Sequence, residues 1–195
     1  LLIALILAAQ CTDDKVNEIT GGHLFAKYRG PLDYVNTPGD ELERDIHSTG
    51  FYRQKTRLVQ NCCAALIERF GGVVPSTREE LLTLPGVGRK TANILLGNAF
   101  GKPAIGVDTH VARLSGRLGF SSRKDPDKIE ADLNEIIPEK DRTRFCHAVQ
   151  SHGRKICSAR KPNCPACTIS KLCPFPDKTT PAPERPLRPA FGRRP

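Results

Sequence analysis

Apolar residues recur along this chain at helical spacing, and no convincing alternation of apolar and polar residues predicts a strand. Helix-start signals agree with this pattern, and they are Thr37 before Pro38, the capping sequence Ser76-Thr77-Arg78-Glu79, and Asp125 before Pro126. The apolar segments lie at 1–9, 16–28, 42–46, 58–70, 79–84, 92–100, 111–118, 129–137 and 145–156. We therefore expect an all-α protein with about six helices before Gly106 and a second group after it.

The breaks between these segments predict two helical lobes. Residues 1–105 form the six-helix lobe, residues 106–173 form the second lobe, and an active-site cleft is expected between them. Residues 174–195 hold seven of the 16 prolines and five basic against two acidic residues. This composition predicts a disordered, basic, proline-rich tail.

The opening sequence LLIALILAAQC could be read as the core of a signal peptide. It lacks a basic start, however, and its apolar run is too short to span a membrane. We therefore expect a buried helix here. Because the sequence contains no methionine, we also expect that it begins inside the natural protein.

The most informative stretch is LPGVGRKTANILLGNAFGKPAIGVDTH, residues 84–110. Gly86 and Gly88 are expected to adopt positive φ and to leave backbone amides free at the start of the helix that follows, which Gly101 is expected to end. Such amides bind phosphate without any side chain. The stretch therefore predicts a phosphate-binding hairpin at 84–100.

Lys90 falls in the first turn of that helix, and Asp108 stands as the N-cap of the next one. The positive end of a helix dipole disfavours a protonated amine, so Lys90 is a candidate nucleophile. Taken singly, Lys90 could be a solvated surface lysine and Asp108 only a helix cap. Their shared context favours a catalytic pair.

The formal charge of +9 favours an anionic partner such as nucleic acid. Four of the eight cysteines form a C-x6-C-x2-C-x5-C motif, made of Cys157, Cys164, Cys167 and Cys173. Four thiolates so close in sequence predict a metal centre, and on chemistry alone zinc and an iron–sulfur cluster both remain open. The other cysteines, Cys11, Cys62, Cys63 and Cys146, lie in apolar segments typical of buried thiols in a reducing cytoplasm.

The hairpin LPGVGRKTA followed by VDTH resembles the endonuclease III branch of the helix-hairpin-helix DNA glycosylases, and the resemblance extends from Leu1 to Cys173. It implies that Lys90 is the nucleophile, that Asp108 assists it, and that the cysteines hold a four-iron four-sulfur (4Fe–4S) cluster. The related adenine glycosylases usually lack a lysine at this place. Lys90 therefore favours a bifunctional glycosylase and abasic-site lyase.

The resemblance also implies that two side chains enter the space that a flipped-out base leaves in the DNA duplex. These side chains are Gln10 and Phe51. Family members commonly carry leucine in place of Phe51. Without the resemblance, Gln10 could be a polar residue at a helix end and Phe51 a core aromatic. His110 is expected either to orient Asp108 or to be a structural histidine. Further DNA contacts are predicted at Gly86, Val87, Gly88, Arg89, Arg160 and Lys161, the last two beside the basic residues Arg154, Lys155 and Lys171.

Together these features predict a base-excision repair enzyme that removes oxidised pyrimidines from damaged double-stranded DNA and nicks the abasic site. We expect a monomer in the bacterial cytoplasm, associated with the nucleoid through DNA, with no membrane partner. One alternative is a glycosylase of the same fold for another lesion, such as adenine opposite oxidised guanine. The other is a non-catalytic DNA-binding protein.

Overall fold

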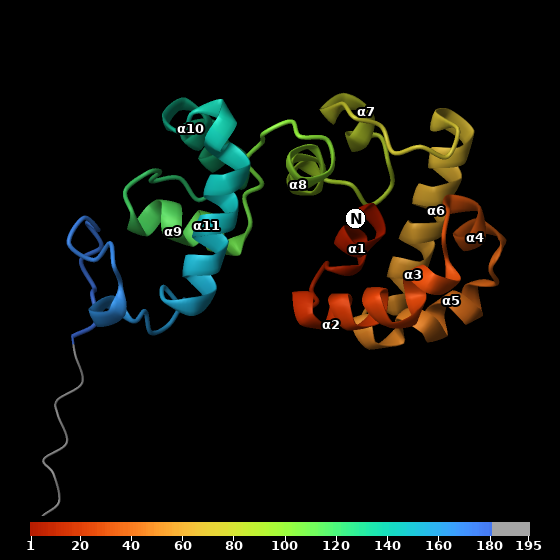
Figure 1. The fold of residues 1–195 in the computed structure, drawn as a ribbon, viewed down its shortest axis with the longest axis horizontal. Coiled ribbons are helices and arrows are strands. Elements are labelled where there is room, and N and C mark those ends of the chain that lie inside the picture. Colours follow the sequence, from red (N-terminus) through yellow and green to blue (C-terminus); the bar gives the residue numbers. More distant parts are fainter. Residues whose placement is uncertain (181–195) are drawn as a thin grey trace, which may run out of the picture.

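The computed structural model describes residues 1–180, which form helices and no strand, as the sequence predicts (Figure 1). The helices are α1 (Leu2–Leu7), α2 (Asp13–Ile19), α3 (Phe25–Lys27), α4 (Pro31–Asn36), α5 (Gly39–Ile46), α6 (Tyr52–Phe70), α7 (Arg78–Leu82), α8 (Arg89–Ala99), α9 (Thr109–Arg117), α10 (Pro126–Ile136) and α11 (Arg142–Lys155). A π-helical turn, Thr20–Leu24, joins α2 to α3. The predicted disorder of residues 181–195 lies outside the described residues.

The first group of buried apolar side chains runs from Leu2 to Ala104 and is built around α6. This helix of 19 residues buries Val59, Cys62 and Leu66 on one face, at the spacing of successive helical turns. Cys62, Cys63 and Cys146 are buried as predicted, but Cys11 is only partly buried. Burial raises the pKa of the Cys62 thiol to about 11. The first lobe therefore has an apolar core of its own.

A second group of buried apolar side chains runs from Ile105 to Val149 and comes mainly from α9, α10 and α11. These helices lie on one side of the molecule, α1–α6 lie on the other, and α8 runs between them (Figure 1). The two groups support the predicted lobes, whose boundary at residue 105 stays a prediction. Helix α8 contacts both groups, because it packs against α1 and α7 on one side and against α11 on the other.

Local sequence signals account for several helix starts. Asp125 caps α10, because its Oδ1 accepts a hydrogen bond from the backbone N–H of Lys128 at 3.0 Å. The cap of α7 is Thr77 and not Ser76, since the Thr77 hydroxyl accepts from the N–H of Glu80. The short helix α4 has no apolar periodicity long enough to predict it.

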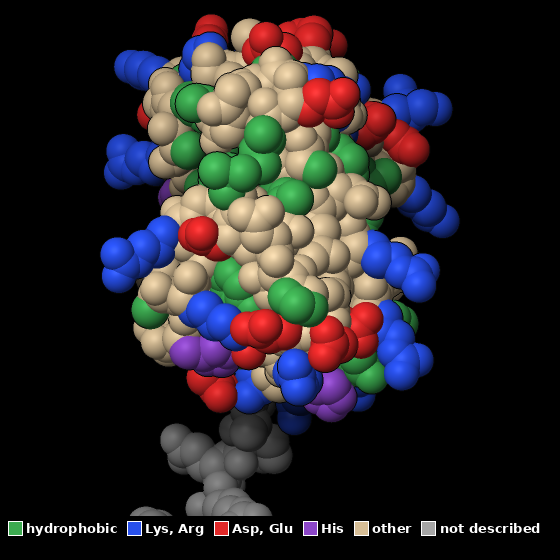
Figure 2. All heavy atoms as spheres, turned by 90° about the vertical axis from the view of Figure 1, so that its right-hand side faces the viewer, with side chains coloured by type: hydrophobic (Ala, Val, Ile, Leu, Met, Phe, Trp, Pro, Cys, Tyr) green, Lys and Arg blue, Asp and Glu red, His purple; other side chains and the backbone are tan. Residues whose placement is uncertain are grey.

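The opening helix α1 is part of the core, as expected, and buries Leu2, Ile6 and Leu7. Within residues 1–180, no helix is both long and apolar enough to cross a membrane. The outer face of the first lobe carries Lys and Arg side chains mainly along its margins, interspersed with acidic residues, and apolar side chains nearer its middle (Figure 2). Exposed apolar residues of α4 include Leu32 and Val35.

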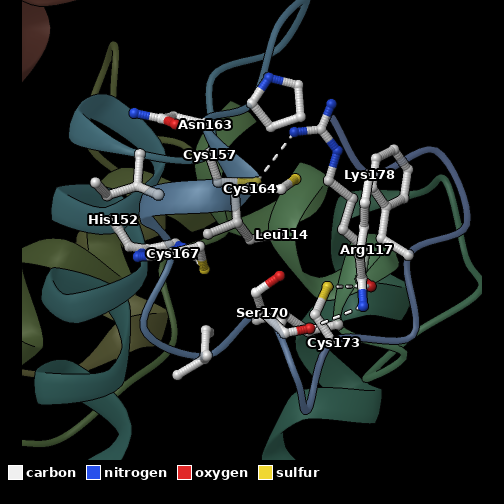
Figure 3. A pocket seen from close by; sticks show the side chains of 15 residues that line it. Leu114, Arg117, His152, Cys157, Asn163, Cys164, Cys167, Ser170, Cys173 and Lys178 are labelled. Carbon is white, nitrogen blue, oxygen red and sulfur yellow. Dashed lines mark hydrogen bonds between the residues drawn. The ribbon is translucent and has the colours of Figure 1, made fainter. Parts of the chain in front are cut away.

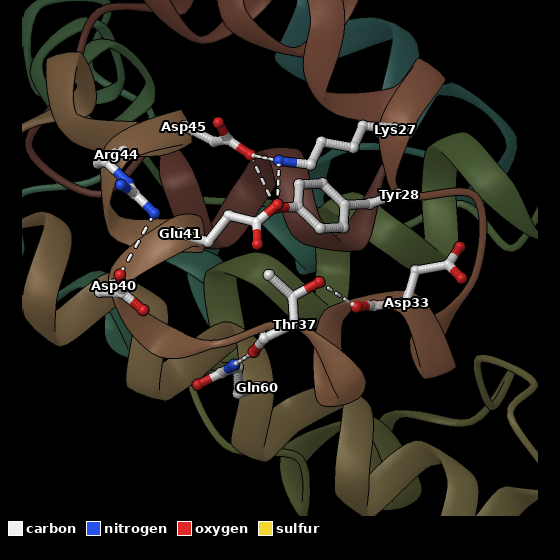
Figure 4. Close-up of polar contacts among 9 residues, drawn as sticks. All are labelled: Lys27, Tyr28, Asp33, Thr37, Asp40, Glu41, Arg44, Asp45 and Gln60. Atoms are coloured by element: carbon white, nitrogen blue, oxygen red, sulfur yellow. Dashed lines mark hydrogen bonds and ion pairs between the residues drawn. The ribbon is translucent and has the colours of Figure 1, made fainter.

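A polar network joins the end of α3 to α5 in the same lobe (Figure 4). Lys27 Nζ lies 2.6 Å from carboxylate oxygens of both Glu41 and Asp45, and the Tyr28 hydroxyl donates to Asp45 at 2.7 Å. Burial alone would raise the pKa of Asp45, but the hydrogen bonds from Lys27 and Tyr28 bring it below its ordinary value. The network therefore holds Asp45 as a carboxylate and fixes α3 against α5.

Candidate active site

The turn before α8 has the geometry of an anion-binding hairpin. Gly86 has φ of +80°, and a Cβ at this position would lie 3.6 Å from Ile6 and Leu58 side-chain atoms. Gly88, which precedes α8, has φ of −92° and ψ of 177°, so the expectation of positive φ is wrong there. The first bond of the helix runs from Ala92 N–H to the Gly88 carbonyl, and the Val87 N–H donates to the Leu84 carbonyl at 3.1 Å. Among the described residues, the N–H groups of Gly86 and Gly88 therefore have no backbone acceptor.

Helix α8 then runs as the sequence predicts. Lys90 is its second residue and is exposed. Gly101, just beyond the last turn, has φ of +62°, and the N–H of Lys102 donates to the Leu96 carbonyl at 2.9 Å. The buried face of α8 packs into the first lobe, which leaves Lys90 at the junction between the lobes.

Close packing brings the chain that leads to Asp108 against the start of α8. A Cβ on Gly106 would lie 2.9 Å from an Ile94 side-chain carbon and 3.5 Å from the Lys90 carbonyl oxygen, so only glycine fits. The buried Asn93 side chain donates to the Ile105 carbonyl at 2.7 Å. These contacts fix the distance between the turn of Lys90 and the turn of Asp108.

Lys90 and Asp108 line the same cleft, which has a volume of about 550 Å³. Asp108 is the N-cap of α9, as predicted, and its Oδ1 accepts from the N–H of Val111 at 2.7 Å. Within residues 1–180, no hydrogen bond engages its second carboxylate oxygen. One oxygen of this carboxylate thus holds the helix, and the other is available to a substrate.

His110 also lines the cleft, but no hydrogen bond joins it to Asp108 among the described residues. Its Nδ1 lies 3.1 Å from a terminal guanidinium nitrogen of Arg113, which also donates to the carbonyls of Gly153 and Cys157. A Cβ on Gly153 would lie 2.8 Å from that same Nδ1. His110 is therefore the structural histidine of the alternative interpretation, packed between α9 and α11.

Several residues of the cleft were not predicted to lie there. Asp13 of α2 forms an ion pair with Arg154 of α11, and this pair joins the two lobes at the cleft. His147, Gln150 and Arg154 line the cleft from one face of α11. Their spacing of three and four residues is a helical signal that could have identified this face.

Arg89 is engaged within the protein and does not point freely toward a ligand. Its guanidinium makes two hydrogen bonds to the Glu130 carboxylate, at 2.7 and 3.2 Å, and these raise the pKa of Arg89. The Glu130 side chain is only 3% exposed and also pairs with Arg78. Arg89 therefore joins the hairpin to α10, and the structure does not support its predicted role as a DNA contact.

Gln10 and Phe51 share an unusual backbone. They are the two described non-glycine residues with positive φ, +53° for Gln10 and +48° for Phe51. This conformation costs roughly 1–2 kcal/mol at a residue with a side chain. Phe51 is 62% exposed, so it is not a core aromatic, and Gln10 is exposed as well. Both residues lie in turns that present their side chains to solvent.

The four cysteines of the motif line one pocket, together with apolar residues such as Leu114, Ile156 and Phe175 (Figure 3). Arg117 of α9 donates to Cys157 Sγ at 3.1 Å, and His152 Nε2 lies 3.6 Å from Cys167 Sγ. No three metal-binding side chains among the described residues are grouped closely enough for a single ion. Four thiols, two nearby nitrogen groups and an apolar wall fit a metal centre that is held by cysteine sulfur.

The chain beyond Cys173 packs back onto this pocket through residue 180. Thr179 Oγ1 accepts from the N–H of Cys164 at 3.1 Å and donates to the Pro162 carbonyl, and Lys178 donates to the Ser170 carbonyl. The Arg117 guanidinium lies 4.6 Å from the centre of the Phe175 ring. The predicted disorder is therefore wrong for residues 174–180, because these contacts hold the segment against the loop that contains the cysteines.

The remaining predicted DNA contacts have different surroundings. Arg160 and Lys161 are exposed in the loop between the first two cysteines. Gly86 and Gly88 are exposed, whereas the Val87 side chain is buried at 6% exposure. The Val87 N–H also donates to the Leu84 carbonyl at 3.1 Å, so neither its side chain nor its amide is free for a phosphate.

Comparison with known proteins gives a consistent result. Residues 3–139 match the HhH-GPD superfamily of base excision DNA repair proteins. The chain is 49% identical over 175 residues to endonuclease III of Synechocystis sp., covering 89% of this chain and 80% of that protein. It is 46% identical over 174 residues to endonuclease III of Bacillus subtilis, covering 89% and 79%.

A solved structure of a trapped endonuclease III–DNA covalent intermediate is similar throughout most of its length. The TM-score is 0.84 at 50% identity, covering 89% of this chain and 81% of that one. A non-covalent endonuclease III–DNA complex gives a TM-score of 0.85 at the same identity and coverage.

Proposed function

Because this chain belongs to the HhH-GPD superfamily of base excision DNA repair proteins and within it to endonuclease III, we propose that it excises oxidised pyrimidines from duplex DNA and then cleaves the abasic strand. It is a DNA glycosylase and abasic-site lyase, and its partner is DNA. One observation carries the assignment of its chemistry. Lys90 and the free oxygen of Asp108 share one cleft, at the end of a hairpin suited to hold phosphate.

Lys90 is the nucleophile of the proposed reaction. Its neutral Nζ attacks C1′ of the damaged nucleotide, the N–C1′ bond forms, and the glycosidic bond breaks with its electron pair going to the departing base, which takes up a proton. The Asp108 carboxylate stabilises the positive charge that develops on the sugar and accepts a proton from the Lys90 nitrogen. Opening of the sugar ring leaves an imine between Lys90 and C1′.

Strand cleavage follows from that imine. Its electron-withdrawing nitrogen acidifies the C2′ proton, whose removal forms a C2′–C3′ double bond as the C3′–O bond breaks and the 3′ phosphate leaves. Water then hydrolyses the imine and regenerates the Lys90 amine. Both steps proceed without a diffusible cofactor.

The target base must leave the helical stack before C1′ is accessible. Gln10 and Phe51 are the proposed wedges, because both are exposed and both are held in turns with left-handed backbone. The backbone amides of Gly86 and Gly88 are proposed to grip a phosphate, and Arg160 and Lys161 to contact the DNA backbone further along. The Arg89 side chain is left out because Glu130 holds its guanidinium, and Val87 is left out because its N–H donates to the Leu84 carbonyl.

We propose that Cys157, Cys164, Cys167 and Cys173 hold a 4Fe–4S cluster. The four thiols line one pocket, and Arg117 supplies an N–H donor to the sulfur of Cys157. When bound, the cluster would cross-link the loop, and it would supply no chemistry to the cleavage steps. Since Arg117 and Arg113 also bind carbonyls of this loop, the loop in turn supports α9, the helix that Asp108 begins.

Replacing Cys164 with serine is expected to remove the cluster from the protein, because a polynuclear site loses one of its four thiolate ligands. The purified wild-type protein is expected to be brown and to contain four irons per chain, whereas the variant should lose the visible absorbance. Cys11→Ser is the matched control, since Cys11 lies outside the motif, and it should remain brown. A colourless wild-type protein that contains zinc would overturn the cluster.

The relatives compared above are bacterial, and we propose that the enzyme acts on DNA in the bacterial cytoplasm. A monomer is the proposed working form. The principal alternative lesion, adenine opposite oxidised guanine, is disfavoured by Lys90, because the adenine-removing relatives usually lack this lysine.

A panel of duplexes tests the lesion class. Duplexes with thymine glycol, dihydrouracil or a plain abasic site are expected to be nicked, and a duplex with adenine opposite oxidised guanine is expected to remain intact. The measurement is base release and strand incision under single-turnover conditions. If the protein removed adenine but did not excise thymine glycol, it would belong with the adenine glycosylases. If it bound every duplex and formed no product, it would be a DNA-binding protein without catalytic activity.

A further inference from the structure

Lys55 is a buried lysine that the proposed chemistry does not use. It lies one turn into α6 and is 3% exposed. Its Nζ donates two hydrogen bonds of 2.8 Å, one to the Leu7 carbonyl and one to the Thr49 carbonyl, and no carboxylate pairs with it among the described residues. Burial lowers the pKa of Lys55. An ammonium group buried without a counter-charge is costly for stability, so its presence calls for a reason beyond packing.

The first of the two carbonyls lies at the end of α1, directly before the turn of Gln10. Leu7 is the last residue of α1, and its carbonyl is one of those that a helix end leaves without an internal partner. The chain then turns, with the N–H of Cys11 donating to the Ala8 carbonyl at 3.2 Å, and Gln10 occupies the left-handed position of this turn. A cation at the end of α1 therefore fixes the point from which the Gln10 turn departs.

The second carbonyl belongs to the turn of Phe51. Thr49 is followed by Gly50, with φ of +70°, and by Phe51, which is the left-handed N-cap of α6. The N–H of Lys55 also donates to the Phe51 carbonyl at 3.0 Å. Lys55 thus holds this turn from two sides, through its backbone and through its side chain.

We propose that Lys55 is a positioning residue that ties the two wedge turns to each other, so that Gln10 and Phe51 enter the duplex as one rigid unit. This inference rests on the proposed function, in which both side chains fill the space that a flipped nucleotide leaves. Each turn has a conformation that its own residue disfavours, and such a conformation persists only where the surroundings determine it. The Lys55 ammonium group holds both turns in these conformations through its two hydrogen bonds. A neutral apolar side chain of the same length cannot make those hydrogen bonds.

The test compares Lys55→Met with the wild-type protein on two substrates, a duplex with thymine glycol and a single strand with an abasic site. The single strand needs no wedge, because it has no partner strand and no stack to be held open. We expect duplex incision to fall on the order of 10²-fold, the scale of a misplaced reacting group, while single-strand cleavage changes little. A purely structural role would lower both activities together and would overturn the proposal.

A matched control and a second variant keep the result interpretable. Lys27→Met removes another lysine of the same lobe, one that pairs with Glu41 and Asp45, and should leave the ratio of the two activities unchanged. If Lys55→Met does not fold, Lys55→Gln keeps a neutral donor at this position. A folded Lys55→Gln protein, as judged by circular dichroism and thermal melting, should show the same selective loss, and a wild-type ratio would contradict the proposal.

The double variant Gln10→Ala/Phe51→Ala separates this inference from the function on which it rests. It should lose duplex incision selectively, and addition of Lys55→Met should then cost little more, because the three residues act as one unit. If the double variant keeps duplex incision, the wedges are wrong. If the double variant loses duplex incision but Lys55→Met lowers it further by as much as in the wild-type protein, Lys55 does not act through Gln10 and Phe51.

Discussion

Lys90→Gln is expected to reduce base excision on the order of 10⁴-fold or more, because it removes the atom that forms the bond to C1′. Glutamine has a side chain of similar size but no nucleophilic amine, so the shape of the cleft changes little. Lys90 is exposed in the structure, and the free energy of unfolding should therefore stay within about 0.5 kcal/mol of wild type. The measurement is single-turnover release of thymine glycol from a duplex.

Lys102→Gln is the matched control for this variant. Lys102 is also exposed and follows the same helix, where it donates to the Ser76 carbonyl at 2.6 Å. Its replacement should leave excision unchanged. Excision by Lys90→Gln at the wild-type rate would eliminate Lys90 as the nucleophile, and excision without strand cleavage would indicate attack by water in place of the lysine.

Asp108→Asn is expected to lower the rate of excision on the order of 10²- to 10³-fold with little effect on stability. Asparagine caps a helix about as well as aspartate, so the hydrogen bond to the N–H of Val111 is kept and α9 still begins at the same place. What is lost is the negative charge that stabilises the cationic sugar and accepts the proton. Single-turnover excision and a thermal melt on the same sample separate these two functions.

Asp108→Ala provides the comparison. It removes both the charge and the cap, and it should cost about 1 kcal/mol of unfolding free energy in addition to the loss of activity. If Asp108→Asn excised the base at the wild-type rate, Asp108 would be only the N-cap of α9 and would have no role in catalysis. A large loss of stability in Asp108→Asn would show that the activity loss has a structural origin.

The sequence predicts the parts of the site that depend on local chemistry. A glycine-rich turn before an apolar helix places Lys90 in a first turn, and a lone aspartate before a helical segment gives Asp108 as the cap. Both assignments depend on neighbours within four residues. The all-α class follows in the same way from periodicity along each segment.

Contacts between distant segments could not be predicted in this way. Arg89 has the sequence context of a phosphate contact, but Glu130, 41 residues later, takes its guanidinium. His110 adjoins Asp108 in sequence, yet its ring faces Arg113 and Gly153. In each case a partner from α10 or α11 decides what the side chain does, and the spacing of the motif contains no information about that partner.

The residues between 174 and 180 illustrate the same limit. Their proline content and charge predict disorder, but Thr179 and Lys178 find backbone partners in the cysteine loop. Lys55 is the converse case, since its position one turn into α6 resembles that of any exposed basic residue. Its burial depends on where α1 ends in space.

Reduction with borohydride tests the central claim most directly, because it converts an imine between enzyme and DNA into a stable bond. Wild-type protein mixed with a thymine glycol duplex and borohydride should give a covalent complex, and peptide mapping should find the sugar remnant on Lys90. Lys90→Gln should give no such complex, and Lys102→Gln should give as much as wild type. The account would be contradicted if the wild-type protein formed no complex, or if the attached residue were any amine other than Lys90.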